Sequence, residues 1–377
     1  MLSRKDPVKL CFSIPELESD TPTHHYHIYE LLEEMGKQIQ LFVVVDKPVV
    51  NRYVLRNIDQ VYFTRFDFFP LRKIEQFLIF CNARLKGFKT FYIHYSLWNA
   101  LITAFITKIS GGKTFLWSCH EYKRKRLNEI NSLAAIKKWI LGMVAIFTFK
   151  AVDFIVTGSS SITSNYIKEF HTTKDKFIIL PNWVSKDRFH FHYSTSKKNR
   201  GQEKTVTFIH SLTKERGAPH LPFIIEKVIN GVRGVNFIII GDGLYKESIQ
   251  DEIKKAGFQD KVKFTGYVPN KEIPKYLSST DILILPSENE GFPRVLIESM
   301  AMGVPFVATN VGGILEIVVP PQTECIVNKG DAEGFSQKVI DLLKDDDLRE
   351  KLIKVGIERV KEYSLEKTIE RFKEIIS

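Results

Sequence analysis

The chain has 377 residues, of which 44% are hydrophobic and 26% charged, and its formal net charge is +10. This composition is typical of a globular protein and excludes a disordered chain, and the length favours two domains over a single core. Four widely separated cysteines show no CxxC or Cys/His ligand spacing, which argues against a disulfide framework and a structural zinc site.

The opening residues 1–16 contain only a short apolar run before charge and proline return, so we interpret them as a first strand and not as a signal peptide. The longest uncharged apolar stretch, WILGMVAIFTF at 139–149, is too short to span a bilayer. An opening segment that is not a signal peptide, an apolar stretch too short to span a bilayer, and cysteines without a disulfide pattern together predict a cytoplasmic protein.

The first half of the chain alternates short β-rich segments with segments of helix length, such as the amphipathic stretch 24–37. The β-rich segments are apolar without polar alternation, as buried parallel strands are, and the rhythm predicts a doubly wound α/β sheet. The predicted strands are 9–14, 39–45, 90–95, 113–119, 152–158 and 176–180.

All of the excess positive charge lies in the same half, because residues 1–190 hold 27 Lys and Arg against 17 Asp and Glu. A basic patch, Lys123, Arg124, Lys125 and Arg126, precedes the apolar segment 137–150. This pattern suits an anionic membrane or a phosphate-bearing partner, and we expect no nucleic-acid partner. Our hypothesis is peripheral docking on the cytosolic membrane face, near a lipid-linked or phosphorylated partner. The alternative is an ordinary buried helix beside a solvated basic loop.

A polar stretch at 191–204 without periodicity is the best linker, and after it the βαβ rhythm restarts. We therefore predict an N-terminal Rossmann-like domain at 1–190, completed by a C-terminal helix at 361–377, and a second one at 205–360. Two such domains predict an active site in the cleft between them. The strands of the second domain are predicted at 205–210, 235–243, 261–268, 281–287, 305–310 and 324–328.

The segment EGFPRVLIE at 290–298 follows one of these strands and leads into a pattern with helical spacing. Pro293 suits the first turn of a helix, and Gly291 allows a ligand to approach the backbone beside Phe292. The helix start then offers unpaired N–H groups and a positive dipole end, for which a diphosphate is the natural ligand. Glu290 and Glu298 would accept hydrogen bonds from hydroxyl groups on either side of it. The alternative is that both are solvated surface acids.

The run LPSENEGFPRVLIESMAMGVPFVATNVGGILEIV at 285–318 resembles the signature of family 4 retaining glycosyltransferases of the GT-B fold, with its E-x7-E pair and GG loop. Further stretches are similar to family motifs, namely PNWVSKDRF at 181–189, GDG at 241–243, the segment 262–287 and the terminal helix. The resemblance covers the second domain almost throughout and the first in outline. It implies two Rossmann-like domains facing an interdomain cleft.

The resemblance also implies residue roles. Glu298 would hold the ribose hydroxyls and Glu290 the donor sugar, with the backbone of Gly291, Phe292 and Pro293 facing the sugar and diphosphate. His120, at a strand end, would lie in the active site near the donor sugar. Further donor-binding residues or phosphate and acceptor contacts are predicted at Gly241, Gly243, Asn182, Ser211, Lys214, Arg216, His24 and His25.

Two departures from the family pattern affect the diphosphate contacts. In IHSLTKERG at 209–217 the position of the family arginine holds Ser211, whereas Arg216 keeps the charge of the family lysine. The glycine pair of the first strand-to-helix loop is absent near Pro22 and Thr23. Lys214 or His210 is expected to compensate for the lost guanidinium, and His24 or His25 lies near the altered backbone path.

The predicted reaction moves a hexosyl unit from a nucleotide-diphosphate sugar to a glycan or lipid-linked acceptor, in cell-surface polysaccharide or glycolipid biosynthesis. We expect no cofactor and no required metal, because the helix dipole and Arg216 would carry the diphosphate charge. The acidic run at 345–347 is better explained as a helix start. The alternatives are a nucleotide-sugar 2-epimerase of the same fold, a glycoside hydrolase and a non-catalytic nucleotide-sugar-binding protein.

Overall fold

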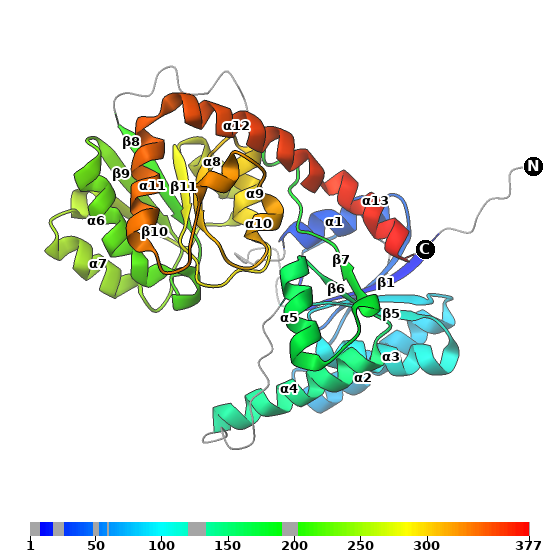
Figure 1. Ribbon diagram of the computed structural model, residues 1–377. Helices are drawn as coiled ribbons and strands as arrows, with labels where there is room; N and C mark the ends of the chain where they lie inside the picture. The colour runs from blue at the N-terminus through cyan, green and yellow to red at the C-terminus, as the bar shows by residue number, and fades with distance from the viewer. Residues whose placement is uncertain are drawn as a thin grey trace, which may run out of the picture. The chain divides into compact units, whose positions relative to one another are not determined.

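A computed structural model describes residues 8–17, 26–47, 53–58, 60–119, 133–190 and 203–376. The chain divides into two compact units (Figure 1). The N-terminal unit comprises residues 1–21, 25–181 and 368–377, and the C-terminal unit comprises 22–24 and 182–367. Residues 182–190 thus group with the C-terminal unit, where Val184 forms a bridge with Ser364. Most of the linker predicted at 191–204 lies outside the described residues.

The N-terminal unit contains a parallel sheet of seven strands in the order β3-β2-β1-β4-β5-β6-β7. All six strands predicted in this half are confirmed, and β3 is an addition. β3 is an edge strand of four residues, QVYF, each of them partly exposed, and its apolar run is limited to Val61–Phe63. The strands are β1 (Lys9–Ile14), β2 (Gln40–Val45), β3 (Gln60–Phe63), β4 (Thr90–His94), β5 (Lys113–Trp117), β6 (Phe154–Thr157) and β7 (Phe177–Ile179).

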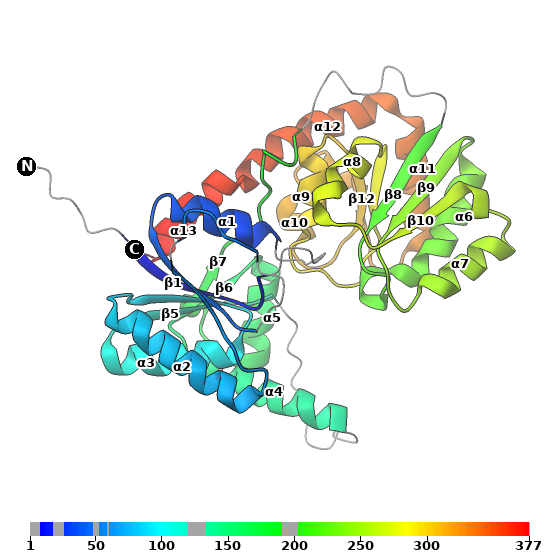
Figure 2. The ribbon, with the colours of Figure 1, turned by 180° about the vertical axis from the view of Figure 1, so that it is seen from behind.

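Helices cover both faces of this sheet, and Figures 1 and 2 show α1 and α13 on one side and α2, α3 and α4 on the other. On the first side, the rings of Phe12 and Tyr92 contact Phe372 of α13, with centroids 6.2 and 4.6 Å away. On the second side, Phe80 of α2 and Phe149 of α4 belong to the core cluster. The helices are α1 (Tyr26–Gly36), α2 (Phe69–Leu85), α3 (Leu97–Ser110), α4 (Leu133–Ala151), α5 (Ser160–Phe170) and α13 (Leu365–Ile376).

The C-terminal unit contains a second parallel sheet of six strands in the order β10-β9-β8-β11-β12-β13, and all six were predicted. The chain leaves β8 toward β9 and β10 but continues from β11 in the opposite direction, so the strand order reverses between β8 and β11. Ligands of open parallel sheets bind at the carboxyl ends of the strands at such a point. The strands are β8 (Lys204–Ile209), β9 (Val235–Ile240), β10 (Val262–Gly266), β11 (Ile282–Leu285), β12 (Phe306–Thr309) and β13 (Ile326–Val327).

Two apolar clusters fill the two faces of the second sheet, one beneath α6, α7 and α11 and the other beneath α8, α9 and α10. The helix start predicted at 345–347 is confirmed, because the Asp345 carboxylate accepts a hydrogen bond from the N–H of Leu348. The helices are α6 (Leu221–Gly231), α7 (Lys246–Lys255), α8 (Ile273–Ser278), α9 (Arg294–Ala301), α10 (Ile314–Ile317), α11 (Ala332–Lys344) and α12 (Asp346–Val360).

Within the parts of the chain that the structure describes, none of the helices combines the length and the apolar character needed to cross a bilayer.

Candidate functional site

The carboxyl end of β11 leads through residues 286–293 into α9, which begins at Arg294. The predicted helix is confirmed, but Pro293 is its N-cap and not a residue of its first turn. Pro293 precedes the first turn with an extended backbone, at φ −68° and ψ 117°. The first N–H groups of a helix have no partner within it and carry the positive end of its dipole. β11 is also one of the two strands at which the sheet order reverses. The segment therefore puts a helix start where a doubly wound sheet binds ligands.

Glu290 is the centre of a buried polar cluster at this edge and is only 7% exposed. Arg216 Nη1 lies 2.6 Å from its Oε2, and the Ser287 hydroxyl donates to its Oε1 at 2.8 Å. His210 Nε2 lies 3.6 Å from the same Oε1. These side chains come from the loops that follow β8 and β11. The two neighbouring loops thus share one carboxylate.

Burial raises the pKa of the Glu290 carboxyl, and the charge of Arg216 with the hydrogen bond from Ser287 opposes that shift in part. The group is therefore protonated at a higher pH than an exposed glutamate. A carboxylate in this position accepts hydrogen bonds from hydroxyl groups when it is ionised.

Arg216 ends a short 3-10 helix, η4 (Lys214–Arg216), and also donates from Nη1 to the carbonyl oxygen of Asn289 at 2.8 Å. The next residue, Gly217, has φ 75°, and a Cβ there would lie 1.9 Å from the carbonyl oxygen of Pro286. A side chain at this position would push the β8 and β11 loops apart. The glycine therefore lets Arg216 reach the segment that carries Glu290.

The loop after β12 approaches the same segment through Gly312, which has φ 58°. A Cβ on Gly312 would lie 1.7 Å from the carbonyl oxygen of Glu290, and Gly313 donates its N–H to the carbonyl of Gly291 at 2.8 Å. Any larger residue at 312 would displace the Glu290 backbone. This explains in physical terms why a glycine stands at position 312.

Glu298 lies on α9 and is 4% exposed. Arg294, one turn earlier, lies with its Nη2 3.3 Å from Glu298 Oε1. Since Glu290 is also buried, the interpretation of both acids as solvated surface groups is wrong. Burying these two carboxylates costs free energy, because charge is removed from water. An acid exposed on the surface does not have this cost.

The other predicted residues of this unit take varied places around the cluster. Gly241 and Gly243 lie in the loop after β9, whose Asp242 carbonyl accepts the N–H of Leu212 at 2.8 Å. Ser211 donates its N–H to His210 Nδ1 at 2.8 Å, and Lys214 is exposed.

Phe292 and Asn182 have a contact that the sequence did not predict. The Asn182 side chain donates to the carbonyl oxygen of Phe292 at 2.6 Å. The Phe292 ring is buried and meets Tyr363 edge-on, with centroids 5.4 Å apart. Asn182 thus supports the turn before α9 from a distant part of the sequence.

Sequence reasoning overlooked Ser287 and Asn289, which precede Glu290 in SENE and supply a hydroxyl donor and a carbonyl acceptor to the cluster. Their position within three residues of Glu290 was the available signal. Several predicted residues lie outside the described residues, and the structure does not place them. These are His24, His25, His120 and the basic patch Lys123, Arg124, Lys125 and Arg126.

The family model of glycosyl transferases group 1 matches residues 192–359, the region that holds this cluster. The 2-deoxystreptamine N-acetyl-D-glucosaminyltransferase of Niallia circulans is 30% identical over 150 residues, which are 40% of this chain and 39% of that protein. The capsular polysaccharide biosynthesis glycosyltransferase CapM of Staphylococcus aureus is 25% identical over 62% of this chain and 63% of its own length. The chain thus spans well under two thirds of the first of these relatives.

Solved structures resemble the chain over nearly its whole length. Anabaena HepE in complex with UDP and glucose has a TM-score of 0.74 at 15% identity, covering 98% of this chain and 99% of that one. A glycosyltransferase from Rickettsia africae has a TM-score of 0.75 at 16% identity, covering 99% and 98%. These likenesses confirm the predicted fold, the GT-B arrangement of two parallel α/β sheets.

Proposed function

We propose that the chain is a retaining glycosyltransferase, because the model of glycosyl transferases group 1 matches residues 192–359. It moves a hexosyl unit from a nucleotide-diphosphate sugar to a glycan or lipid-linked acceptor. One observation carries the proposal: the buried Glu290 cluster and Glu298 flank the start of α9, where the sheet order reverses. A cationic side chain, a helix N-terminus and two buried carboxylates suit a ligand that combines a diphosphate with hydroxyl groups.

In this proposal the diphosphate lies at the α9 N-terminus, with Arg216 as the nearest cation of the cluster. Glu298 accepts hydrogen bonds from the ribose and Glu290 from the donor sugar. Ser211, Lys214 and the turn of Gly241 and Gly243 add phosphate contacts. His120 lies near the sugar, and His24, His25 and Asn182 are further phosphate or acceptor contacts.

The proposed reaction forms a bond between the acceptor oxygen and the anomeric carbon while the bond from that carbon to the diphosphate oxygen breaks. The acceptor proton passes to the departing phosphate oxygen, so no covalent enzyme intermediate is required. Front-side attack retains the anomeric configuration. The protein contributes positioning and stabilises the charge on the leaving group. This proposal needs neither cofactor nor metal ion.

The acceptor belongs to cell-surface polysaccharide or glycolipid biosynthesis in this proposal. CapM, which is 25% identical over 62% of this chain, is a capsular polysaccharide biosynthesis glycosyltransferase. This similarity supports a role in polysaccharide biosynthesis. We place the protein in the cytoplasm with peripheral contact at the cytosolic face of an anionic membrane.

A panel of UDP- and GDP-sugars tests the proposal, first by thermal shift and then by turnover with glycan and lipid-linked acceptors. We expect one nucleotide class to raise the melting temperature and a glycosylated product with the donor's anomeric configuration. A changed sugar on the nucleotide without acceptor would identify a 2-epimerase. Binding without turnover of any donor would identify a non-catalytic nucleotide-sugar-binding protein.

A further inference from the structure

The outward side of α2 is apolar. Leu71, Ile74, Leu78 and Leu85 recur at spacings of three, four and seven residues, which places them along one stripe of the helix. All four are exposed, Leu78 by 61%. Phe68, just before the helix, extends the stripe and is also exposed. A surface helix of a globular protein normally presents polar residues there.

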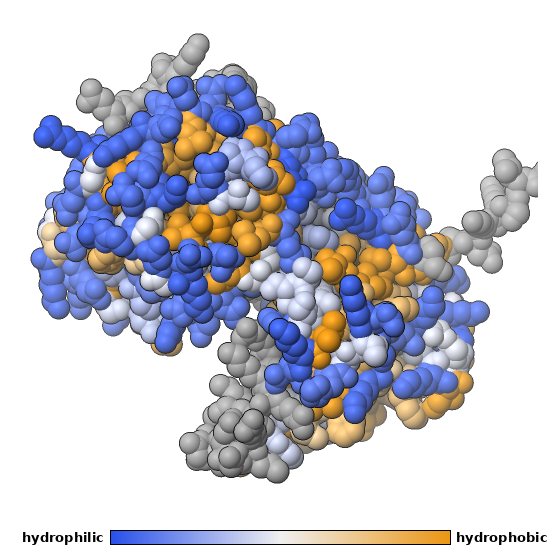
Figure 3. Space-filling model, viewed as in Figure 1, coloured by the Kyte–Doolittle hydropathy of each residue, from blue (hydrophilic) through white to orange (hydrophobic). Residues whose placement is uncertain are grey.

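The neighbouring helices of the same unit carry the same feature. On α3 the exposed residues Trp98, Phe105 and Ile109 lie on one stripe, and Ile109 is 72% exposed. On α4 Ile140 and Phe147 are exposed at a spacing of seven. The α2 and α3 stripes adjoin, because the Phe69 and Trp98 rings meet edge-on with centroids 5.7 Å apart, and α4 packs against α3. Figure 3 shows hydrophobic residues along the part of the unit where Figure 1 draws α2 and α3.

We call this surface the α2–α4 face. It consists of Phe68, Phe69, Leu71, Ile74, Leu78, Leu85, Trp98, Phe105, Ile109, Ile136, Ile140, Leu141 and Phe147.

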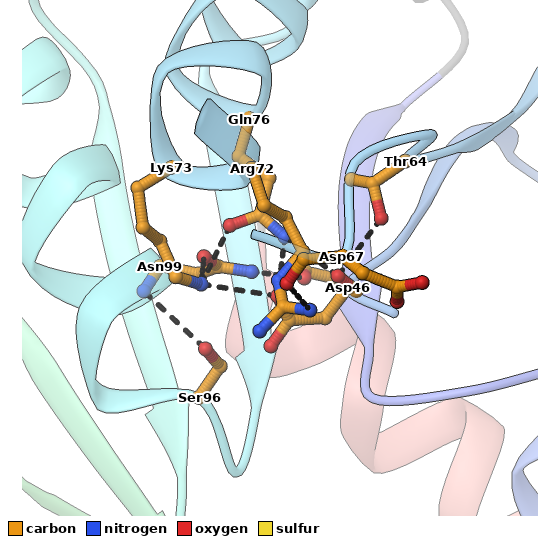
Figure 4. Close-up of polar contacts among 9 residues, drawn as sticks. Asp46, Thr64, Asp67, Arg72, Lys73, Gln76, Ser96 and Asn99 are labelled. Atoms are coloured by element: carbon orange, nitrogen blue, oxygen red, sulfur yellow. Dashed lines mark hydrogen bonds and ion pairs between the residues drawn. The ribbon is translucent and has the colours of Figure 1, made fainter. Parts of the chain in front are cut away.

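Polar bonds on the inner side of α2 fix the rotation of this helix (Figure 4). Lys73 Nζ bonds to Asp46 Oδ1 at 3.0 Å, to Gln76 Oε1 at 2.6 Å and to Asn99 Oδ1 at 2.9 Å. Gln76 also donates to the Asp46 carbonyl at 2.9 Å. Turning α2 to bury its apolar stripe would break this buried ion pair and expose Phe80 of the core. The apolar stripe is therefore held outward.

The charge around the α2–α4 face is mainly positive, although the exposed Asp67 lies just before α2 beside Phe68. In sequence the three helices contain seven Lys and Arg residues but a single acid, Glu75. That acid is buried and accepts from Arg65 Nε at 2.9 Å, so it places no free negative charge on the surface. Exposed Lys108 and Lys150 follow Phe105 and Phe147 by three residues and so lie beside them.

We propose that the α2–α4 face docks on an anionic lipid bilayer. Apolar side chains rimmed by cations suit the boundary between acyl chains and anionic headgroups, where the apolar groups insert and the lysines meet phosphate. An equally apolar contact with a second protein would not require the near absence of acids. The inference rests on the proposed function only in supposing that a lipid-linked acceptor brings the enzyme to the membrane.

Sedimentation of the full chain with lipid vesicles tests the proposal. We expect binding to vesicles of equal parts phosphatidylglycerol and phosphatidylcholine, and little to phosphatidylcholine alone. The quadruple variant Ile74→Gln, Leu78→Gln, Phe105→Gln and Ile109→Gln should bind at least about tenfold more weakly, since the inserted side chains are lost. Lys108→Gln and Lys150→Gln should each weaken binding about fivefold and reduce its sensitivity to salt.

The matched control replaces three exposed apolar residues elsewhere, as Val54→Gln, Leu244→Gln and Leu315→Gln, and should bind like the wild type. Lys254→Gln with Lys255→Gln on α7 controls for the loss of charge. Near-identical thermal unfolding of all variants shows that folding is intact.

Equal vesicle binding by the wild type and the quadruple variant, or no binding by the wild type, would overturn the proposal. A wild-type dimer in light scattering that becomes monomeric in the quadruple variant, without vesicle binding, would show that a second copy covers the face. Vesicle binding is measured without a donor. Failure of every nucleotide sugar to turn over would therefore refute the proposed function and leave the docking result standing.

Discussion

Arg216 Nη1 lies 2.6 Å from Glu290 Oε2, and the two residues belong to loops that follow different strands. Glu290 is buried, whereas Arg216 is partly exposed. In the proposed complex Arg216 binds the diphosphate and Glu290 binds a hydroxyl group of the sugar. The two partners of one ion pair would then contact different ends of the donor. The contacts to the two ends of the proposed donor are therefore expected to depend on each other.

The effects of removing the two partners of this pair on the free energy of unfolding should be smaller together than the sum of the single effects. Arg216→Ala leaves Glu290 buried without its cation and should lower the free energy of unfolding by about 1–3 kcal/mol. Arg216→Ala with Glu290→Gln should fall short of the sum of the single effects by about 0.5–3 kcal/mol. Urea denaturation of the four proteins measures this, with exposed Arg233→Ala as the control. Additive effects would show that the two residues are independent.

The pH dependence of stability should report Glu290. Burial raises its folded-state pKa above the unfolded value. Its contribution to the free energy of unfolding is therefore full below the unfolded pKa, about 4.3, and is lost as the pH rises through the folded pKa. The stability of the wild type relative to Glu290→Gln should decline over that range. Urea denaturation of both proteins at a series of pH values measures the difference in unfolding free energy. A difference that does not change with pH would contradict a raised pKa of Glu290.

Gly312→Ala should be far more damaging than Gly330→Ala. Both glycines have positive φ, 58° and 85°, but only the Cβ at 312 would meet the Glu290 carbonyl, whereas the space beside Gly330 is open. Backbone strain alone should cost Gly330→Ala about 1–2 kcal/mol. Gly312→Ala should cost clearly more and weaken nucleotide binding, as thermal unfolding and calorimetric titration will show. Equal effects would mean that the contact with Glu290 is unimportant.

Glu298→Ala tests the proposed ribose contact. Loss of hydrogen bonds to a buried carboxylate should weaken nucleotide binding by about 1.5–3 kcal/mol, or roughly 10- to 150-fold. Calorimetric titration with the nucleotide chosen by thermal shift measures it. Exposed Glu324→Ala is the matched control and should bind normally. Unchanged affinity in Glu298→Ala would remove this residue from the donor site.

Lys73→Met tests the ion pair that fixes α2. The side chains of Lys73 and Asp46 are only 13% and 16% exposed, so an unpaired Asp46 should cost about 3–5 kcal/mol of unfolding free energy. The surface pair of Lys37 and Glu34 is the control, and Lys37→Met should cost at most about 1 kcal/mol. Urea denaturation compares them. A small effect of Lys73→Met would mean that this pair does not hold the helix.

Local sequence determined much of this protein. Buried parallel strands are short apolar runs, so twelve of the thirteen strands among the described residues could be located from the local sequence pattern. Pro293 marked the start of α9 and Asp345 that of α12, because helix starts depend on residues close in sequence. β3 was not predicted, because its apolar run covers only Val61–Phe63 and all of its residues are partly exposed.

Only the tertiary structure decided which distant residues meet. Arg216 and Glu290 are 74 positions apart, and their pairing depends on the adjacency of β8 and β11, which local pattern does not encode. Likewise, α2 is apolar on more than one side, so its sequence does not indicate which side faces out. Lys73 settles this by pairing with Asp46 after β2 and Asn99 on α3, because a buried charge requires its partners whatever apolar surface is then left exposed.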